Sequence, residues 1–295
     1  MKDTFSGLHP IVNFTYFTAV ILFSMFFMHP VFLGFSLVSA LIYSIYLNGI
    51  KAAKFNFLYM LPLLLLVALI NPLFNHEGVT ILLFINDNPI TYESIIYGIA
   101  SATMFISVII WFSCYNSVVT SDKFIYLFGK IIPSLSLILS MTLRFVPKFK
   151  AQIKVISNAQ KCIGRDVSNG NVLQRARNGI KIISILITWA LENSIETADS
   201  MKCRGYGLKG RTSFSNYRFD KRDKSVLGTI CVLILLMIFG MFLGENTIDY
   251  FPSIIFKEIT IISVIVYIGY AALLLIPVAL NIMEDIKWYH LKSKI

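Results

Sequence analysis

The stretch IIYGIASATMFISVIIWFSCY, residues 95–115, contains no Asp, Glu, Lys or Arg. As a helix it would be about 30 Å long, which matches the thickness of the hydrocarbon core of a bilayer. Five further stretches share this apolar character, with Glu258 at the edge of the last: residues 11–28, 31–47, 57–74, 226–243 and 258–281. The sequence therefore predicts an all-α polytopic membrane protein with about six transmembrane helices.

The composition of the whole chain agrees with this class. Of its 295 residues, 56% are hydrophobic and 14% are charged, whereas soluble domains have about 45–50% and about 25%. These values exclude a disordered chain, a coiled coil and most soluble enzymes, and they make the lipid bilayer an expected partner. The net charge of +10 must lie outside the hydrocarbon, where charged side chains are costly.

The distribution of basic residues predicts the orientation in the membrane. Lys51 and Lys54 lie between the second and third apolar stretches, and the C-terminal tail is also basic. The loops 75–94 and 244–256 contain no Lys or Arg. Because basic residues are enriched in short cytoplasmic loops, we expect both termini to be cytoplasmic.

The segment 120–225 separates the fourth and fifth apolar stretches and holds 19 of the 26 Lys and Arg, against 7 of the 16 Asp and Glu, a net charge of +12. We divide the chain into an N-terminal bundle (1–119), a cytoplasmic or partly embedded region (120–225) and C-terminal spans with a short tail (226–295). Within this region the run 124–147 is apolar in its centre. It could be partly embedded or lie against the bundle.

Two long amphipathic helices are expected in this region. In the first, beginning near Lys148, the apolar positions repeat with helical spacing up to Gly164, and a loop follows at 166–171. The second runs over about 172–202. One stripe on it is apolar, and the stripe beside it is acidic and consists of Glu192, Glu196 and Asp199.

The second helix should end at Cys203-Arg204-Gly205-Tyr206-Gly207, because Gly accepts the left-handed conformation of a helix cap. A cation such as Arg204 is favoured at this end by the helix dipole. The helix pair could rest on anionic lipid with Arg204 as a capping charge. It could also dock a partner, because Arg pairs well with a carboxylate. The absence of an obvious soluble core favours the partner.

Other chemical functions are weakly supported. The pattern in 205–212 resembles a phosphate-binding loop, but Arg211 stands where Lys is needed and no strand precedes it. The four Cys and four His form no metal-ligand spacing. The acidic stripe has no His or Cys partner for acid–base work, and the basic segment lacks the interleaved aromatics of a nucleic-acid site.

Specific motifs resemble the transmembrane coupling (T) component of energy-coupling factor (ECF) transporters, a class of ABC-type importers. Ala198 to Gly207, followed by Gly210-Arg211-Thr212, is similar to a signature of that family. The segments 120–124 and 143–147 and the pair His9-Pro10 also fit. The resemblance implies a bacterial cell-membrane protein that is not an enzyme and binds no cofactor, with ATP and Mg held by its partners.

The resemblance also implies partners and site residues. Two cytoplasmic ABC ATPases would dock at the ends of two crossing coupling helices, and a small substrate-binding membrane subunit (S component) would carry a vitamin or metal ion. The docking residues would be Cys203, Arg204 and Gly205 at one end and Ile163, Gly164 and Arg165 at the other. Ile163 stands where Arg is usual, so Arg165 could serve in its place. Arg144, Glu192, Glu196 and Asp199 would support the helices.

Three other classes of protein remain as alternatives. A self-contained secondary carrier or channel would need polar residues at the midplane and often repeats. A membrane enzyme would need a nucleophile–base or metal constellation. A conventional ABC permease would carry one short coupling helix in place of two long ones.

Overall fold

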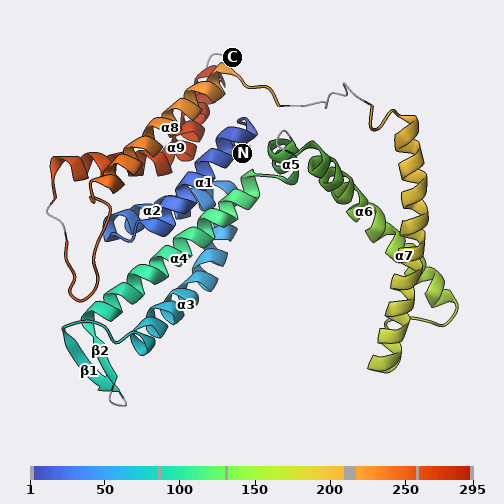
Figure 1. Ribbon diagram of the computed structural model, residues 1–295, viewed down its shortest axis with the longest axis horizontal. Coiled ribbons are helices and arrows are strands. Elements are labelled where there is room, and N and C mark those ends of the chain that lie inside the picture. The colour runs from blue at the N-terminus through green and yellow to red at the C-terminus, as the bar shows by residue number, and fades with distance from the viewer. Residues whose placement is uncertain (1–2, 86–87, 130–131, 209–216, 257–258, 293–295) are drawn as a thin grey trace. The chain divides into compact units, whose positions relative to one another are not determined.

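The computed structural model describes residues 3–85, 88–129, 132–208, 217–256 and 259–292 (Figure 1). The elements in these ranges are α1 (Pro10–Phe26), α2 (Pro30–Asn48), α3 (Ile50–Phe74), β1 (Ile81–Ile85), β2 (Asn88–Thr91), α4 (Tyr92–Val118), α5 (Ser121–Gly129), α6 (Pro133–Cys162), α7 (Val172–Cys203), α8 (Lys221–Phe242) and α9 (Ile261–Lys292). They form two compact units. The membrane unit combines Met1–Phe124 with Tyr217–Ile295, and the insert is Ile125–Asn216.

The membrane unit contains the apolar helices. Among the described residues, α2, α4, α8 and α9 are long and apolar enough to cross a bilayer, and α1 and the Leu58–Phe74 part of α3 are shorter apolar helices. These helices correspond to the six apolar stretches of the sequence. The prediction of an all-α polytopic membrane protein is therefore confirmed.

Two helices of the membrane unit begin in the same way. His9 precedes Pro10 at the start of α1, and His29 precedes Pro30 at the start of α2. Each His accepts a hydrogen bond at Nδ1 from the backbone N–H of the second residue of its helix, at 3.3 Å. Proline suits the first helical position because its missing N–H would have no partner there.

The centre of the membrane unit is aromatic. Tyr16 and Phe17 of α1 pack with Trp111 of α4, with ring centroids 6.2 and 6.4 Å apart. Trp111 donates a hydrogen bond from Nε1 to Ser36 Oγ at 3.2 Å, and Ser36 lies 2.8 Å from Ser24 Oγ. These contacts join α1, α2 and α4 and satisfy polar groups that neither lipid nor water could reach.

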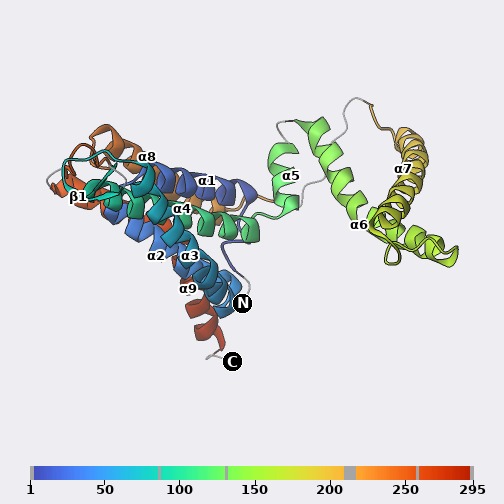
Figure 2. The ribbon, with the colours of Figure 1, turned by 90° about the horizontal axis from the view of Figure 1, so that it is seen from below.

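Small residues let neighbouring helices approach closely. A Cβ atom at Gly98 of α4 would lie 2.8 Å from the backbone oxygen of Ala68 in α3, and one at Gly269 of α9 would lie 2.6 Å from the side chain of Leu236 in α8. The pairs α3–α4 and α8–α9 accordingly run side by side in Figure 1, and α3 and α4 are also seen next to each other in Figure 2. Packing through small residues is typical of membrane helices.

The N-terminal segment closes one end of the membrane unit. Thr4 donates its N–H to Asn281 Oδ1 of α9 at 2.8 Å, and His9 donates its N–H to Asp223 Oδ1 of α8 at 3.2 Å. Lys123, which is 7% exposed, donates to the backbone oxygens of Ser6 and Val118. The beginning of the chain, the end of α9 and both connections to the insert therefore meet at the same end of the unit.

The antiparallel hairpin of β1 and β2 lies in a segment for which the hydropathy pattern predicts only a loop. It lies between α3 and α4. Thr80 donates from Oγ1 to Glu93 Oε1 at 2.7 Å, and Thr91 donates from Oγ1 to the backbone oxygen of Glu77 at 2.7 Å. These bonds fix the base of the hairpin to the first turn of α4.

The insert consists of the end of α5 followed by α6 and α7, whose ribbons cross in Figure 1. The expected bounds of the second helix and of the loop at 166–171 agree with the structure, but the first helix begins at Pro133 and not near Lys148. Proline at the first position favours this start. The run 124–147 is therefore divided between α5 and the first half of α6.

Candidate docking surface of the helix pair

A contact of aromatic and cationic side chains holds α6 and α7 together where they cross. The rings of Phe149 and Trp189 pack edge to face with centroids 5.9 Å apart. Lys148 Nζ lies 5.3 Å from the centroid of the Trp189 ring and donates to Asn193 Oδ1 at 2.7 Å. The apolar spacing of the first predicted helix includes Phe149. Its contact with Trp189 was not predicted, because local spacing does not specify which positions of two helices meet.

Few side chains of the insert are buried. In its described part, Ile156 of α6 and Ile182 of α7 are 7% and 6% exposed. Ile153 and Ile163, which the apolar spacing had placed on the same stripe as Ile156, are 43% and 62% exposed. The apolar spacing therefore located the inner face of α6, but only part of that face is covered by α7.

The two helices end in matching backbone geometry. In α7 the C-cap is Arg204, followed by Gly205 with φ 78°, and Tyr206 donates its N–H to Met201 O at 3.0 Å. This bond and that of Gly205 N–H to Lys202 O, at 3.0 Å, define a Schellman motif.

In α6 the same bonds run from Arg165 N–H to Gln160 O, at 2.9 Å, and from Gly164 N–H to Lys161 O, at 3.0 Å. The C-cap is Ile163, and Gly164 has φ 75°. Ile163 is thus the structural equivalent of Arg204, and Cys162-Ile163-Gly164 corresponds to Cys203-Arg204-Gly205. Arg165 lies two positions later than the Arg of the other end.

Cap geometry alone does not distinguish the ends of α6 and α7 from other helix ends, because α8 ends at Gly244 with the same pair of bonds. The difference is in the side chains. Each long helix of the insert has an exposed Cys at its last position, and each has an exposed Arg at or just beyond the cap: Cys162, Arg165, Cys203 and Arg204. Both ends therefore offer a cation at the negative end of a helix dipole.

The loop after α6 is organised by Asp166. Its Oδ2 accepts from Ser168 Oγ at 2.6 Å, its Oδ1 accepts from Ser168 N–H at 3.0 Å, and Lys161 Nζ lies 3.3 Å away. The bonds from Ser168, with a smaller effect of Lys161, lower the pKa of Asp166 to about 2. The carboxylate is therefore ionised at neutral pH and holds the loop that carries Arg165.

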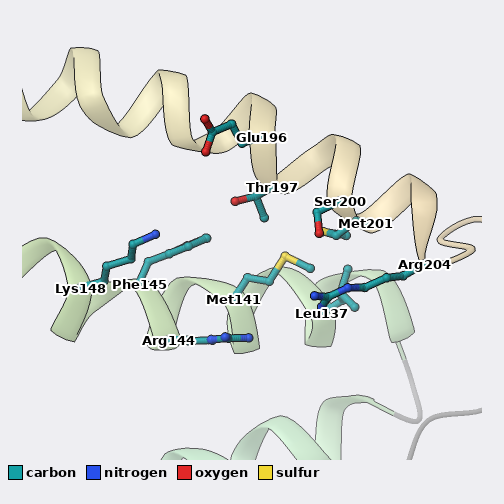
Figure 3. A pocket seen from close by; sticks show the side chains of 10 residues that line it. All are labelled: Leu137, Met141, Arg144, Phe145, Lys148, Glu196, Thr197, Ser200, Met201 and Arg204. Atoms are coloured by element: carbon teal, nitrogen blue, oxygen red, sulfur yellow. The ribbon is translucent and has the colours of Figure 1, made fainter.

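A groove of about 550 Å³ lies between α6 and α7. Figure 3 shows Arg204 reaching into it from the end of α7 and Arg144 lying along α6 on the opposite wall. Lys148 and Glu196 also line it. Three cations thus face a single acid, and among the described residues Arg144, Arg204 and Glu196 form no ion pair.

The other sequence-predicted residues lie outside this groove. Glu192 and Asp199 are exposed on α7, and Asp199 Oδ1 lies 3.8 Å from Lys202 Nζ. The structure therefore brings together Arg144, Glu196 and Arg204, but it does not place Glu192 or Asp199 with them. Lys209-Gly210-Arg211-Thr212, which completes the loop-like pattern and the signature, lies outside the described residues.

A stripe of exposed apolar side chains runs along the opposite face of α7. The members, which we call the outer stripe, repeat at intervals of seven, seven, four and four residues: Leu173, Ile180, Ile187, Leu191 and Ile195. Each is more than half exposed. The stripe extends for about 33 Å at 1.5 Å per residue. Exposed apolar surface of this extent is typical of a protein or membrane interface.

No metal site emerges from the described residues, because they contain no cluster of three or more His, Cys, Asp or Glu side chains that could hold an ion. The four Cys at 114, 162, 203 and 231 are not joined in disulfides.

Comparisons with known proteins identify the family. The family model for CbiQ, described as a cobalt transport protein, matches residues 8–214. Relatives named energy-coupling factor transporter transmembrane protein EcfT include those of Lactococcus lactis subsp. cremoris (33% identical over 105 residues), Streptococcus thermophilus (36% over 105) and Bacillus subtilis (32% over 106).

These matches cover 35–36% of this chain and 39–40% of the relatives, so the aligned part is about two fifths of their length. The family model covers most of the chain and includes α1 to α7. With the apolar helices, these findings show a multi-pass bacterial membrane protein that is a transporter component. The chain therefore belongs to the CbiQ family, and its resemblance to the T components of energy-coupling factor transporters is confirmed.

Proposed function

We propose that this chain is the non-catalytic coupling subunit of an energy-coupling factor transporter for a vitamin or a metal ion. It would transmit the ATP-driven motion of two cytoplasmic ABC ATPases to a separate S component. The observation that carries the proposal is the pair of long helices with matching caps, each presenting an exposed Arg at its end.

The helix ends are suited to dock ATPases. The Schellman bonds occupy backbone carbonyls in the last turn of each helix, and the exposed side chains at and just beyond the cap are available to a partner. Arg204 would enter an acidic groove of one ATPase as a bidentate donor. Arg165 would take this role at the other end, where Ile163 supplies only apolar contact. Because the two ends differ, we expect them to bind two different ATPases.

The outer stripe is suited to hold the S component. Its five side chains gain about 1.5–3 kcal/mol each when fully buried, which is enough to offset part of the cost of association. They face away from α6, so a partner could cover them without separating the two helices.

The crossing contact would let the pair move as one body. The Phe149–Trp189 rings and the bond from Lys148 to Asn193 tie α6 to α7 near their middle. Packed helices shift as rigid elements more readily than they deform. A change in separation of the ATPases at the two ends would therefore be passed to the outer stripe.

The basic insert and the positive-inside rule support cytoplasmic termini. The N-terminal segment contacts α9, so both lie at the same end of the membrane unit, as an even number of spans requires. In this arrangement the insert, which leaves and re-enters the membrane unit at that same end, would face the cytoplasmic ATPases.

The test is charge reversal at each helix end. Arg204→Glu is expected to remove one ATPase from the complex purified through a tag on this chain and to abolish uptake. Arg165→Glu should impair binding of the other ATPase. Lys181→Glu, an exposed position that lies more than two turns from either end of α7, is the matched control and should bind both. Normal recovery of both ATPases with either cap variant would contradict the docking role of that Arg.

A further inference from the structure

A second groove lies in the membrane unit, between α2, α3 and α4, with a volume of about 790 Å³. Ile106 and Ile110 of α4 form its floor and are 4% and 1% exposed. Leu41 of α2 and Leu61 of α3 belong to its walls. Among the side chains that the structure describes here, Lys54 is the one lining residue that is not apolar.

Lys54 lies at one end of this groove. It is exposed in the second turn of α3, and Ile45, near the end of α2, lines the groove with it. The groove extends from this end along α2 to Leu37, which is about 12 Å at 1.5 Å per residue. Lys54 forms no ion pair with the described residues.

We propose that this groove binds one anionic phospholipid, with an acyl chain along the leucine and isoleucine side chains and the headgroup phosphate at Lys54. The chemistry of the two parts matches: hydrocarbon lies along the apolar length, and a phosphate oxygen meets the ammonium group. Lysine binds phosphate as a point charge, and basic pockets between transmembrane helices are typical sites for acidic headgroups.

The geometry favours a lipid over another protein as the occupant. The helices α2 and α3 pack against each other, and both pack against α4. A further helix, about 10–12 Å in diameter with its side chains, cannot enter between helices that are already in contact, whereas an extended acyl chain can. The groove also runs along the axes of apolar helices, which is the direction of lipid tails in a bilayer.

The charge pattern places this lipid in one leaflet. The connecting segment between the apolar stretches of α2 and α3, which includes the first two turns of α3, contains Lys51 and Lys54 and no acidic residue. The same basic residues predict that this connection is cytoplasmic. The site should therefore take its lipid from the inner leaflet, where the phosphate of a phosphatidylglycerol can approach Lys54.

Native mass spectrometry of the full chain tests the proposal. The protein would be purified in detergent and exposed to equal amounts of phosphatidylglycerol and phosphatidylcholine. We expect the wild type to retain one phosphatidylglycerol with at least a fivefold preference. Lys54→Gln should reduce the preference to about one, and Lys54→Arg should restore it. Lys224→Gln, an exposed Lys in α8, is the control and should keep it.

A second pair of variants tests the groove itself. Leu61→Trp fills the space and should lower retention of both lipids, whereas Leu235→Trp, on an exposed face of α8, should not. Unchanged preference in Lys54→Gln, or unchanged retention in Leu61→Trp at normal thermal stability, would overturn the proposal. Equal retention of the two lipids by the wild type would indicate an apolar groove without a headgroup site. This result would also overturn the proposal.

Discussion

The crossing of α6 and α7 depends most on Trp189. Its ring packs edge to face on Phe149, and Lys148 lies over the ring and also bonds to Asn193. We predict that Trp189→Ala separates the two helices while the membrane unit stays folded. Phe149 and Trp189 lie near the middle of α6 and α7, so loss of their contact leaves both halves of each helix less restrained.

The magnitude follows from the contacts that are lost. Trp189 is half-buried, so truncation exposes on the order of 100 Å² of apolar area, or about 2.5 kcal/mol at 25 cal/mol per Å². The edge-to-face ring pair adds about 0.5–1.5 kcal/mol, and the exposed cation–π contact adds about 0.5–1 kcal/mol. Because these contributions overlap, we expect a local loss of about 3 kcal/mol.

Hydrogen exchange of the full chain in nanodiscs measures this loss. A change of about 3 kcal/mol raises the open population more than 100-fold, so peptides from α6 and α7 should exchange faster by that order. Ile187→Ala, two positions away on the outer stripe and 54% exposed, is the control and should change exchange by less than about twofold. Identical exchange of α6 and α7 in Trp189→Ala and wild type would refute the reasoning.

Three further predictions concern single backbone or loop positions. Gly205→Ala forces a Cβ into a left-handed conformation, which costs about 1–2 kcal/mol, and we expect several-fold weaker binding of the ATPase at this end in pull-down titrations. Because the pKa of Asp166 is low, its stabilisation of the loop after α6 is complete above about pH 4 and is lost only as the pH falls toward 2. Asp166→Asn removes this carboxylate, so tryptic cleavage after Arg165 at neutral pH should rise about fivefold. Gly98→Ala places its Cβ against the α3 backbone and should cost about 1–3 kcal/mol, seen as a lower Tm in detergent, whereas Gly34→Ala has open space around it and should not lower the Tm.

The apolar helices could be predicted because the bilayer imposes a simple rule on sequence. A helix that crosses hydrocarbon must satisfy its backbone internally and carry few charges along its length, and residues 95–115 show both length and composition. The ends of α6 and α7 could be predicted for a similar reason, because Gly164 and Gly205 adopt the left-handed conformation that Gly accepts most readily.

The remaining features depend on contacts between distant residues. The start of α6 at Pro133 was missed because its first half is apolar and carries a second Pro at position 147, inside the helix. The hairpin at 81–91 depends on pairing and on the bond from Thr80 to Glu93. The approach of Arg144 to the groove that holds Arg204 depends on how two helices cross, which local spacing does not specify.

The central claim is that this chain couples ATPases to a substrate-binding membrane subunit. The most direct measurement is purification of the tagged chain from its native membranes in mild detergent, with mass spectrometry of every protein that stays bound. The account predicts two ABC ATPases together with at least one small membrane protein, and it predicts that the ATPases are lost or reduced with Arg204→Glu and Arg165→Glu combined. Recovery of the folded chain alone, with transport by that chain in liposomes, would contradict the account and indicate an autonomous carrier or channel.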